Sequence, residues 1–243
     1  MNKTKKRILG IIPARGGSKK VPKKNIKLLN GKPLIYYTIN EAIKSKYIDR
    51  LILSTDDKEI ASIGSKYGVE VPFIRPDKLS GDYVTDLPVF KHCLSWMNSN
   101  EGYCPDILVH LRPTAPMRTC ENIDSAIKLL LNNPSMDSIR SVTKVSEHPM
   151  KMWKKNSDKL TPFITDLESG IKESYNMPRQ KLPNVFIQNG SVDVIWARTI
   201  LEKDSMSGEA IKPYIMDERN SINIDTELDF YLAEILIRNK SEN

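Results

Sequence analysis

The chain has 243 residues, of which 40% are hydrophobic, and this is sufficient apolar sequence for the core of one domain. Its mean hydropathy is −0.41, and no apolar stretch approaches the roughly 20 residues that cross a bilayer, so we expect no membrane partner. The net charge of +7 has a local origin, because residues 1–32 hold eleven of the 37 lysines and arginines and the remaining chain has a net charge of −4. A nucleic-acid-binding protein usually spreads its basic surface, so this distribution argues against nucleic acid and favours a single polyanionic ligand.

Two further features predict a cytoplasmic protein. The basic N-terminus is followed by an apolar run of only Ile8 to Ile12 before Pro13, which is too short for the core of a signal peptide. The cysteines are odd in number and lack CxxC spacing, which indicates free thiols in a reducing compartment. These cysteines are Cys93, Cys104 and Cys120.

In the first half of the chain, short β-rich runs alternate with helical hydrophobic patterns. Strands are predicted at residues 6–12, 50–55, 106–111 and 138–145, with an extended run at 69–74. Helices are predicted at residues 33–45, 56–68, 86–97 and 120–133. This alternation predicts a parallel, doubly wound sheet that binds its ligands beyond the carboxyl ends of the strands.

The pattern changes in the second half of the chain. Residues 147–188 are rich in proline, lysine and asparagine, and we expect them to form a projecting arm or lid within a single domain of residues 1–243. The chain then returns to regular patterns. A strand is predicted at 191–197, short extended segments at 211–216 and 221–224, and an amphipathic helix at 226–239.

The segment that follows the first predicted strand is unusually basic. Residues 13–25 read PARGGSKKVPKKN, with one arginine and four lysines around a glycine pair and no acidic residue before Glu41. A strand, a glycine-bearing loop and a helix together direct backbone N–H groups at phosphate oxygens, and basic side chains add charge-assisted bonds. The loop matches neither GxxxxGK[ST] nor GxGxxG. We interpret it as a site for a nucleoside triphosphate.

A longer set of motifs connects this loop to a known family. IIPARGGSKKVPKKNIKLLNGKPLIYYTI, IRPDKLSGD, LRPTAPMR, EHPMK, MPRQKLP, QNGSVDV and SINIDTELD occur in this order and span nearly the whole chain. In these segments the chain resembles the cytidylyltransferases that activate 3-deoxy-ulosonic acids such as N-acylneuraminates. The resemblance implies an α/β, three-layer nucleotide-diphospho-sugar transferase fold with a mainly parallel sheet and a projecting dimerisation arm. It also implies a homodimer that depends on Mg²⁺ and joins CTP to the anomeric hydroxyl of a sugar acid.

The resemblance assigns residues to the nucleotide. The catalytic set that it implies is Arg15, Lys19, Lys24 and Asp225. The residues that it places along CTP are Ala14, Arg15, Gly16, Gly17, Ser18, Lys19, Lys24, Asn25 and Arg75. Attack on an α-phosphate develops charge on the leaving pyrophosphate, so cations and positioning are the expected source of catalysis. For Arg75, a salt bridge within its loop is the alternative to a contact with cytosine.

For the metal, the resemblance points to the segment SINIDTELD. Asp225 is the predicted Mg²⁺ ligand, and a cap on the last helix is its alternative role. The family usually has two aspartates here, whereas this chain has Asn223 in place of the first. The predicted metal residues are therefore Asp225 and Asn223. An amide oxygen can ligate Mg²⁺ but adds no charge, so either the metal depends on Asp225, substrate phosphates and water, or another acid compensates.

For the sugar acid, the resemblance implies a cationic partner for the carboxylate and polar groups for hydroxyls and acyl amides. The predicted substrate residues are Arg112, Lys151, Arg179, Gln188, Asn189 and Asp193. Arg112 stands where relatives often have glutamine, and a structural ion pair is its alternative role. Lys151 matches a lysine donated across the dimer interface, with a solvated surface charge as the alternative. Asp193 suits an amine or hydroxyl of the substrate, or equally a second metal ligand.

Other functions compete with this interpretation. The same fold accepts octulosonates and sugar 1-phosphates, and fold alone does not determine substrate. Because Asn223 replaces an acid, a non-catalytic CTP-binding protein is a further alternative. The sequence leaves open which ulosonic acid is used.

Overall fold

The computed structural model describes residues 5–241 and divides into two compact units. The first unit runs to Val142 and resumes at Asn189, and the second unit is Thr143–Gln188. The first contains a six-stranded sheet with the order β10-β6-β9-β5-β1-β4. The strands are β1 (Ile8–Pro13), β4 (Arg50–Ser54), β5 (Ile107–His110), β6 (Ser138–Lys144), β9 (Phe186–Trp196) and β10 (Ile211–Ile215).

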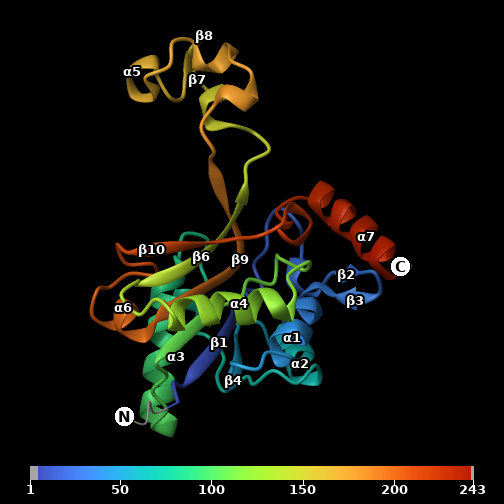
Figure 1. Ribbon diagram of the computed structural model, residues 1–243. Coiled ribbons are helices and arrows are strands. Elements are labelled where there is room, and N and C mark those ends of the chain that lie inside the picture. Colours follow the sequence, from blue (N-terminus) through green and yellow to red (C-terminus); the bar gives the residue numbers. More distant parts are fainter. Residues whose placement is uncertain (1–4, 242–243) are drawn as a thin grey trace. The chain divides into compact units, whose positions relative to one another are not determined.

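The sheet is mainly parallel, as the sequence predicts (Figure 1). Ile11 of β1 pairs with Ile52 of β4 on one side and with His110 of β5 on the other. The exception is β9, which runs antiparallel to β5 and sets Asp193 opposite His110. Because β1 and β5 are parallel neighbours, the loops that follow them leave the sheet from the same edge.

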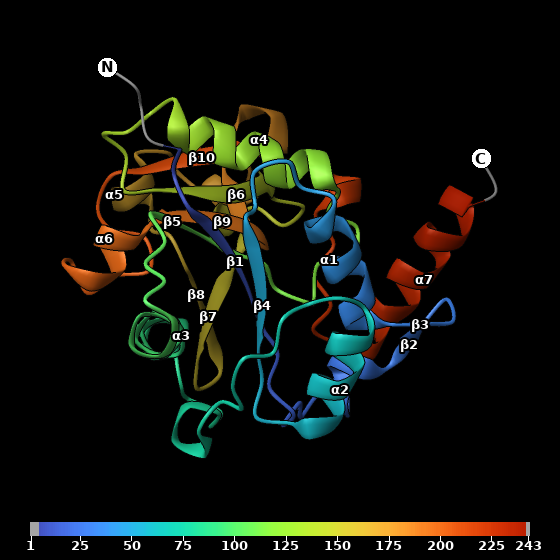
Figure 2. The same ribbon diagram turned by 90° about the horizontal axis from the view of Figure 1, so that it is seen from below.

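Alternating residues of β1 enter two different cores, which is the period of a strand buried on both faces. Ile8 and Ile12 pack with helices α1, α2 and α4, whereas Leu9 and Ile11 pack with α3 and α6. Figure 2 shows α3 and the α1–α2 pair on opposite sides of the sheet. The helices are α1 (Leu34–Ile43), α2 (Lys58–Lys66), α3 (Asp86–Glu101), α4 (Cys120–Leu131) and α6 (Ala197–Leu201).

A third, smaller core lies between the β2–β3 hairpin and the C-terminal helix. Strands β2 (Leu28–Leu29) and β3 (Lys32–Pro33) pair antiparallel, and Leu29 is fully buried against helix α7 (Glu227–Ser241). The apolar partners from the segment before α7 and from α7 itself are Ile224, Phe230 and Ala233. This packing attaches the end of the chain to the region just after the basic loop.

Side chains determine where several helices begin. Asp57 accepts the N–H groups of Glu59 and Ile60 at 2.7 and 3.0 Å, which starts α2 directly after β4. Thr119 and Asn122 form a reciprocal capping box at the start of α4. Short 3₁₀ turns are η1 (Lys24–Ile26), η2 (Asp77–Leu79), η3 (Pro149–Lys151), η4 (Ser174–Asn176), η5 (Arg179–Lys181) and η6 (Glu218–Asn220).

Two extended segments predicted from sequence do not form strands. Residues 69–74 contribute one parallel bridge between Glu70 and Ile52, and Pro72 has no N–H with which to continue a ladder. Residues 221–224 have no strand pairing, and Ile224 instead donates its N–H to the carbonyl of Thr114. Both segments therefore connect elements near the ligand-binding edge of the sheet.

The second unit is small and has its own hairpin. Strands β7 (Trp153–Asn156) and β8 (Lys159–Pro162) pair antiparallel, and α5 (Asp166–Ser169) follows with a Thr165–Glu168 capping box. The rings of Trp153 and Tyr175 lie 4.7 Å apart. The unit begins four residues before the predicted 147–188 segment and ends at the same residue. No helix among residues 5–241 is both long enough and apolar enough to span a bilayer.

Candidate active site

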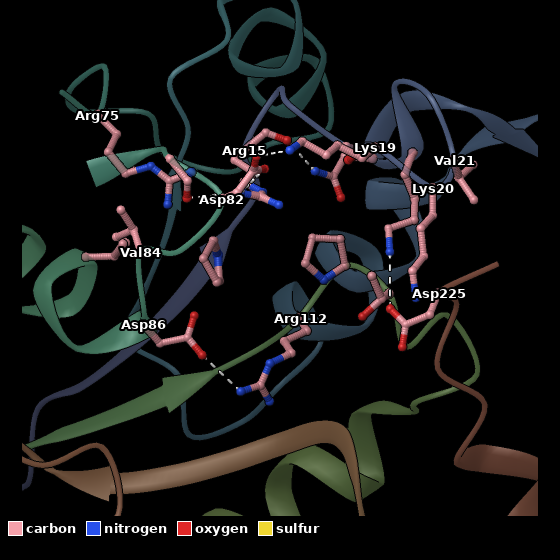
Figure 3. Close-up of a pocket in the computed structure, with 18 of the residues that line it drawn as sticks. Arg15, Lys19, Lys20, Val21, Arg75, Asp82, Val84, Asp86, Arg112 and Asp225 are labelled. Atoms are coloured by element: carbon pink, nitrogen blue, oxygen red, sulfur yellow. Dashed lines mark hydrogen bonds and ion pairs between the residues drawn. The ribbon is translucent and has the colours of Figure 1, made fainter. Parts of the chain in front are cut away.

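A cavity of about 530 Å³ opens at the carboxyl edge of β1 and β5. It lies within the first unit. Its walls come from the loop after β1, the 75–89 segment, the turn after β5 and Asp225 on the segment before Glu227 (Figure 3). The lining residues are Pro13, Arg15, Ser18, Lys19, Lys20, Val21, Lys24, Asn25, Arg75, Leu79, Gly81, Asp82, Tyr83, Val84, Asp86, Val89, Arg112, Pro113, Thr114 and Asp225. Of these, six are basic and three are acidic, so the cavity carries an excess of positive charge. This balance suits a polyphosphate.

Acidic residues from distant segments neutralise part of the basic loop. Asp82 lies 3.1 Å from Nη1 of Arg15 and also pairs with Nζ of Lys19, as Figure 3 shows. The same arginine nitrogen donates to the carbonyl of Gly81 at 3.0 Å. Hydrogen bonding to Lys19 is the main cause that lowers the pKa of Asp82, so this carboxylate is ionised at neutral pH. Arg15 and Lys19, which were predicted to bind phosphate, are thus already paired with the carboxylate of Asp82.

The backbone of the loop makes internal contacts. Gly16 donates its N–H to Asp56 at 3.1 Å, and a Cβ at Gly16 would lie 2.8 Å from an oxygen of Asp57. Glycine is therefore required by close approach, whereas Gly17 faces open space. Ala14 is buried and extends the β1–β4 ladder by donating to the carbonyl of Ser54. Of the predicted CTP residues, Ala14 and the two glycines support the cavity without lining it.

Lys24 joins the basic loop to the segment before α7. Its Nζ donates to the carbonyl of Ile224 at 2.7 Å and lies 3.5 Å from Oδ1 of Asp225. Asn25 is buried and donates through Nδ2 to the carbonyl of Arg15 at 2.9 Å, which holds the loop closed. The predicted phosphate and metal residues therefore meet across the cavity although about 200 positions separate them in sequence.

Helix α7 is capped by residues other than Asp225. The carboxylate of Asp229 accepts the N–H groups of Asp225 and Thr226, and Thr226 accepts the N–H of Asp229 in return. The capping role considered for Asp225 is therefore wrong. Its side chain is 61% exposed and is therefore accessible to a ligand in the cavity.

Asn223 contacts this carboxylate through its nitrogen. Nδ2 of Asn223 donates to Oδ2 of Asp225 at 2.8 Å. The amide oxygen is turned elsewhere, so the structure does not bring the oxygens of the two residues together. Within residues 5–241, no group of three or more His, Cys, Asp or Glu side chains has the arrangement of a metal site. Asp225 alone fits the usual mode of Mg²⁺, which often takes one protein carboxylate and completes its shell with phosphate and water.

Arg75 is held in the wall of the cavity. Its side chain is 4% exposed and lies 3.5 Å from Asp56, the same aspartate that binds the N–H of Gly16. Burial lowers the pKa of its guanidinium, and Asp56 opposes that effect. Its Nε has no hydrogen-bond partner among the described residues. Arg75 therefore forms an ion pair, which is the alternative considered from sequence, and it also lines the cavity.

Arg112 lies on the floor of the cavity between two aspartates. Its guanidinium donates to Asp86 at 3.0 Å and to Asp193 at 3.3 Å, and Arg140 contacts the second oxygen of Asp193 at 3.3 Å. Asp193 is 3% exposed and is not among the cavity-lining residues. The structure therefore places Arg112 where it can meet a ligand and Asp193 behind it as a support.

His110 is enclosed by this cluster. Burial, followed by the charge of Arg112, lowers its pKa to about 4, so the imidazole is neutral at physiological pH. Burial raises the pKa of Asp86, but His110 in its protonated form, the charge of Arg112 and the hydrogen bond from Arg112 together lower it by more. Neither ring nitrogen of His110 has a hydrogen-bond partner among the described residues. The floor of the site is thus a network that holds Arg112, and His110 and Asp193 are its buried members.

The other predicted substrate residues are not in this cavity. Asn189 is buried, and its amide is used by Ser141, Ser191 and Ser221. The remaining three lie in the second unit and are Lys151, Arg179 and Gln188. There, Lys151 donates to the carbonyl of Tyr175 at 3.2 Å. Arg179 donates to the carbonyl of Val145 and lines a separate cavity of about 300 Å³ within that unit.

Sequence reasoning missed five charged residues of the site, and one of them, Lys20, lies within the basic loop itself and lines the cavity. Asp82 lies inside the quoted motif IRPDKLSGD, so a search for acids within family motifs would have found it. Asp56, Asp86 and Arg140 have no such signal, because their roles depend on partners that only the fold brings near.

Comparison with known proteins agrees with this geometry. A family profile described as Cytidylyltransferase matches residues 9–159, which include the basic loop, the cavity wall and Arg112. The chain belongs to the cytidylyltransferase family. It is 34% identical to the CMP-N,N'-diacetyllegionaminic acid synthase of Legionella pneumophila over 97% of this chain and 98% of that protein.

Further similarities extend over most of the chain. It is 30% identical to the pseudaminic acid cytidylyltransferase of Campylobacter jejuni, over 97% of this chain and 98% of that relative. A solved structure of CMP:2-keto-3-deoxy-manno-octonic acid synthetase complexed with CTP matches with a TM-score of 0.69 and 14% identity. That match covers 96% of this chain and 99% of the other, and at this identity it shows the shared fold alone.

Proposed function

We propose that this cytidylyltransferase joins CMP from CTP to the anomeric hydroxyl of a nonulosonic acid and releases pyrophosphate. The observation that carries the proposal is the cavity at the carboxyl edge of a parallel sheet, which Arg15, Lys19 and Lys24 line together with Asp225. Relatives at 30–34% identity over almost the whole chain are named for legionaminic and pseudaminic acids. This supports a nonulosonic acid as the acceptor.

The reaction is a nucleotidyl transfer. The anomeric oxygen of the sugar acid attacks the α-phosphorus of CTP, a new P–O bond forms, and the bond to pyrophosphate breaks as the hydroxyl proton is lost. Negative charge grows on pyrophosphate, and Arg15, Lys19 and Lys24 are the cations that line its place in the cavity. Because the nucleophile belongs to the substrate, the protein contributes position and charge.

Two groups of lining residues lie at opposite ends of the cavity. Lys19 and Asp225 lie at one end, and Arg75 and Val84 lie at the other (Figure 3). Lys24 belongs to the first end, because its Nζ lies 3.5 Å from Asp225. We assign the first end to the triphosphate and the second to cytosine. Arg75 can donate to the carbonyl of the base from a wall in which it is already held by Asp56.

We assign Asp225 to the Mg²⁺ on which this reaction would depend. Its carboxylate is exposed to the cavity and is not used in helix capping. When bound, Mg²⁺ would neutralise phosphate charge, and Lys24 beside Asp225 would assist in the same region.

Arg112 is the proposed partner of the acceptor's carboxylate within the first unit. Asp86 and Asp193 hold its guanidinium at the cavity, and a planar guanidinium binds carboxylates well. We further propose that the enzyme is a cytoplasmic homodimer in which the second unit of one subunit supplies Lys151, Arg179 and Gln188 to a sugar-acid site. Support for an interface comes from exposed apolar residues of that unit, which include Met152, Trp153, Leu160, Phe163 and Leu167.

The test of the function is pyrophosphate release from CTP with Mg²⁺ against a panel of legionaminic, pseudaminic and N-acylneuraminic acids and an octulosonate. Sugar 1-phosphates and the nucleotides UTP and GTP are the controls. We expect release with CTP and one nonulosonic acid. Turnover with only a sugar 1-phosphate would contradict the proposal and leave the fold intact, and CTP binding without turnover of any acceptor would favour a sensor. Sedimentation equilibrium tests the dimer separately.

A further inference from the structure

Asn223 and Asp225 form an unusual pair at the edge of the cavity. Asp225 lines the cavity, and Asn223 precedes it by two residues on the segment before α7. Nδ2 of Asn223 donates to Oδ2 of Asp225 at 2.8 Å, while Nζ of Lys24 lies 3.5 Å from Oδ1 of the same carboxylate. Each carboxylate oxygen therefore faces a donor supplied by the protein.

The amide orientation has a physical cause. Reversing the amide would place Oδ1 of Asn223 against a carboxylate oxygen, and two acceptors at hydrogen-bond distance repel. In the observed orientation, Oδ1 points toward β9, where a Cβ on Gly190 would lie 3.7 Å away. This oxygen is buried and has no hydrogen-bond partner among the described residues. The contact with Asp225 therefore determines the amide orientation even though the oxygen is left unpaired.

A metal-ligating amide would behave differently. It would direct its oxygen at the ion that the neighbouring carboxylate also binds. Here the nitrogen faces the carboxylate and the oxygen faces away, so the pair does not converge on one point. Where two carboxylates lie side by side, a cation between them offsets their repulsion. Here the Nδ2 donor of Asn223 stands in place of a second carboxylate, so no positive charge is needed between the two side chains.

We propose that Asn223 is a positioning residue, which holds the Asp225 carboxylate toward Lys24 and the cavity by a hydrogen bond and is not itself a metal ligand. The kinetic consequence of this inference rests on the proposed function. Its structural consequence does not, because the contact between the two side chains exists without substrate.

The first test uses the melting temperature of the full chain without nucleotide, in EDTA and then in excess MgCl₂. We expect the wild-type protein to respond little to Mg²⁺. Asn223→Asp turns the donor into a second carboxylate, so it should melt about 2–4 °C lower in EDTA and recover in Mg²⁺. Asn220→Asp is the matched control, because it adds the same charge three residues away and its side chain has no hydrogen bond with Asp225; it should not become Mg²⁺-dependent.

The second test is kinetic. Asn223→Leu keeps the approximate volume and removes the donor, so kcat for pyrophosphate release should fall at least about ten-fold while KM for CTP changes less. Asn223→Asp in saturating Mg²⁺ should regain most of this loss, which a merely structural role would not predict.

Three outcomes would overturn the inference. One is a kcat of Asn223→Leu equal to that of the wild-type protein. Another is a melting temperature of Asn223→Asp that does not change with Mg²⁺. The third is Mg²⁺-dependent melting of the wild-type protein that Asn223→Leu abolishes, since this would make Asn223 a ligand. If no acceptor reacts in any assay while Asn223→Asp still becomes Mg²⁺-dependent, the proposed function fails and the positioning contact stands.

Discussion

Two aspartates in the first unit each hold two cations, and they do so in opposite surroundings. Asp82 is on the surface of the cavity with Arg15 and Lys19, and its side chain is 33% exposed. Asp193 is 3% exposed and lies between Arg112 and Arg140. Water screens the exposed carboxylate of Asp82 more than the buried carboxylate of Asp193, so Arg15 and Lys19 can exchange Asp82 for a ligand while Asp193 stays as a permanent support of its two arginines. The difference separates a binding surface from its support.

The largest effect is expected at the buried set. Asp193→Asn removes a carboxylate that is 3% exposed and leaves two guanidinium groups, each 27% exposed, with one fewer charge partner, so we expect a loss of about 3 kcal/mol in the free energy of unfolding. Urea denaturation measures it. Asp82→Asn is the matched control and should leave the midpoint of unfolding nearly unchanged. Equal destabilisation by the two variants would contradict the comparison.

The pH dependence of the free energy of unfolding should report on His110, which belongs to the same network. Its pKa is about 4 in the folded protein and ordinarily 6.5, so the unfolded chain takes up a proton first as the pH falls. The free energy of unfolding should therefore decrease from about pH 6.5 to 4 by up to about 3 kcal/mol. Aspartates with lowered pKa, such as Asp86, lose their contribution to the free energy of unfolding only below about pH 3.8. Their pH range is therefore separate from that of His110.

His110→Leu should flatten the stability profile between these pH values. His92 is the control, because its pKa is also lowered by burial but it is the less enclosed histidine, so His92→Gln should flatten the profile much less. A profile unchanged in His110→Leu would show that other groups cause the dependence.

At the exposed set, the expected effect is on turnover. Lys24→Ala removes the ammonium that faces Asp225 and should lower pyrophosphate release by about 10²–10³-fold while the melting temperature stays near the wild-type value. Lys20 lines the same cavity but forms no ion pair among the described residues, so Lys20→Ala should retain activity within a few-fold. Similar losses in both variants would indicate a general charge effect rather than a specific contact.

The smallest effect is expected for Asp82 itself. Asp82→Asn frees Arg15 and Lys19 from their internal anion, and inorganic pyrophosphate should bind up to about five-fold more tightly in calorimetry without Mg²⁺. Weaker binding would mean that Asp82 serves to hold the two cations in place. The gain should shrink as the salt concentration rises.

Local patterns predicted the elements of the sheet well and its pairings less well. The alternating runs indicated β1, β4, β5 and their helices, because apolar periodicity is a property of each segment alone. The same pattern could not show that β9 runs antiparallel to β5, since strand direction depends on the route of the whole chain. Residues 69–74 have strand-like composition, but Pro72 cannot continue a ladder.

The candidate site was predictable where one loop supplies the chemistry. Arg15, Lys19 and Lys24 were expected at a phosphate site from their place after a strand, and the structure lines the cavity with all three. Asp193 was expected to face a ligand, but its alternating position on β9 cannot show which neighbours cover it, and two arginines do. Roles that depend on distant partners lie outside the reach of local patterns.

The contact between Lys24 and Asp225 has a consequence for the making of the protein. A ribosome completes the basic loop early, yet the carboxylate that faces it is 201 positions later. Until that late segment emerges and packs, a growing chain has a phosphate-attracting loop but no finished cavity. Contacts this distant in sequence form late and slow the folding of a domain. Chains that stop short of this segment should therefore be unable to retain CTP.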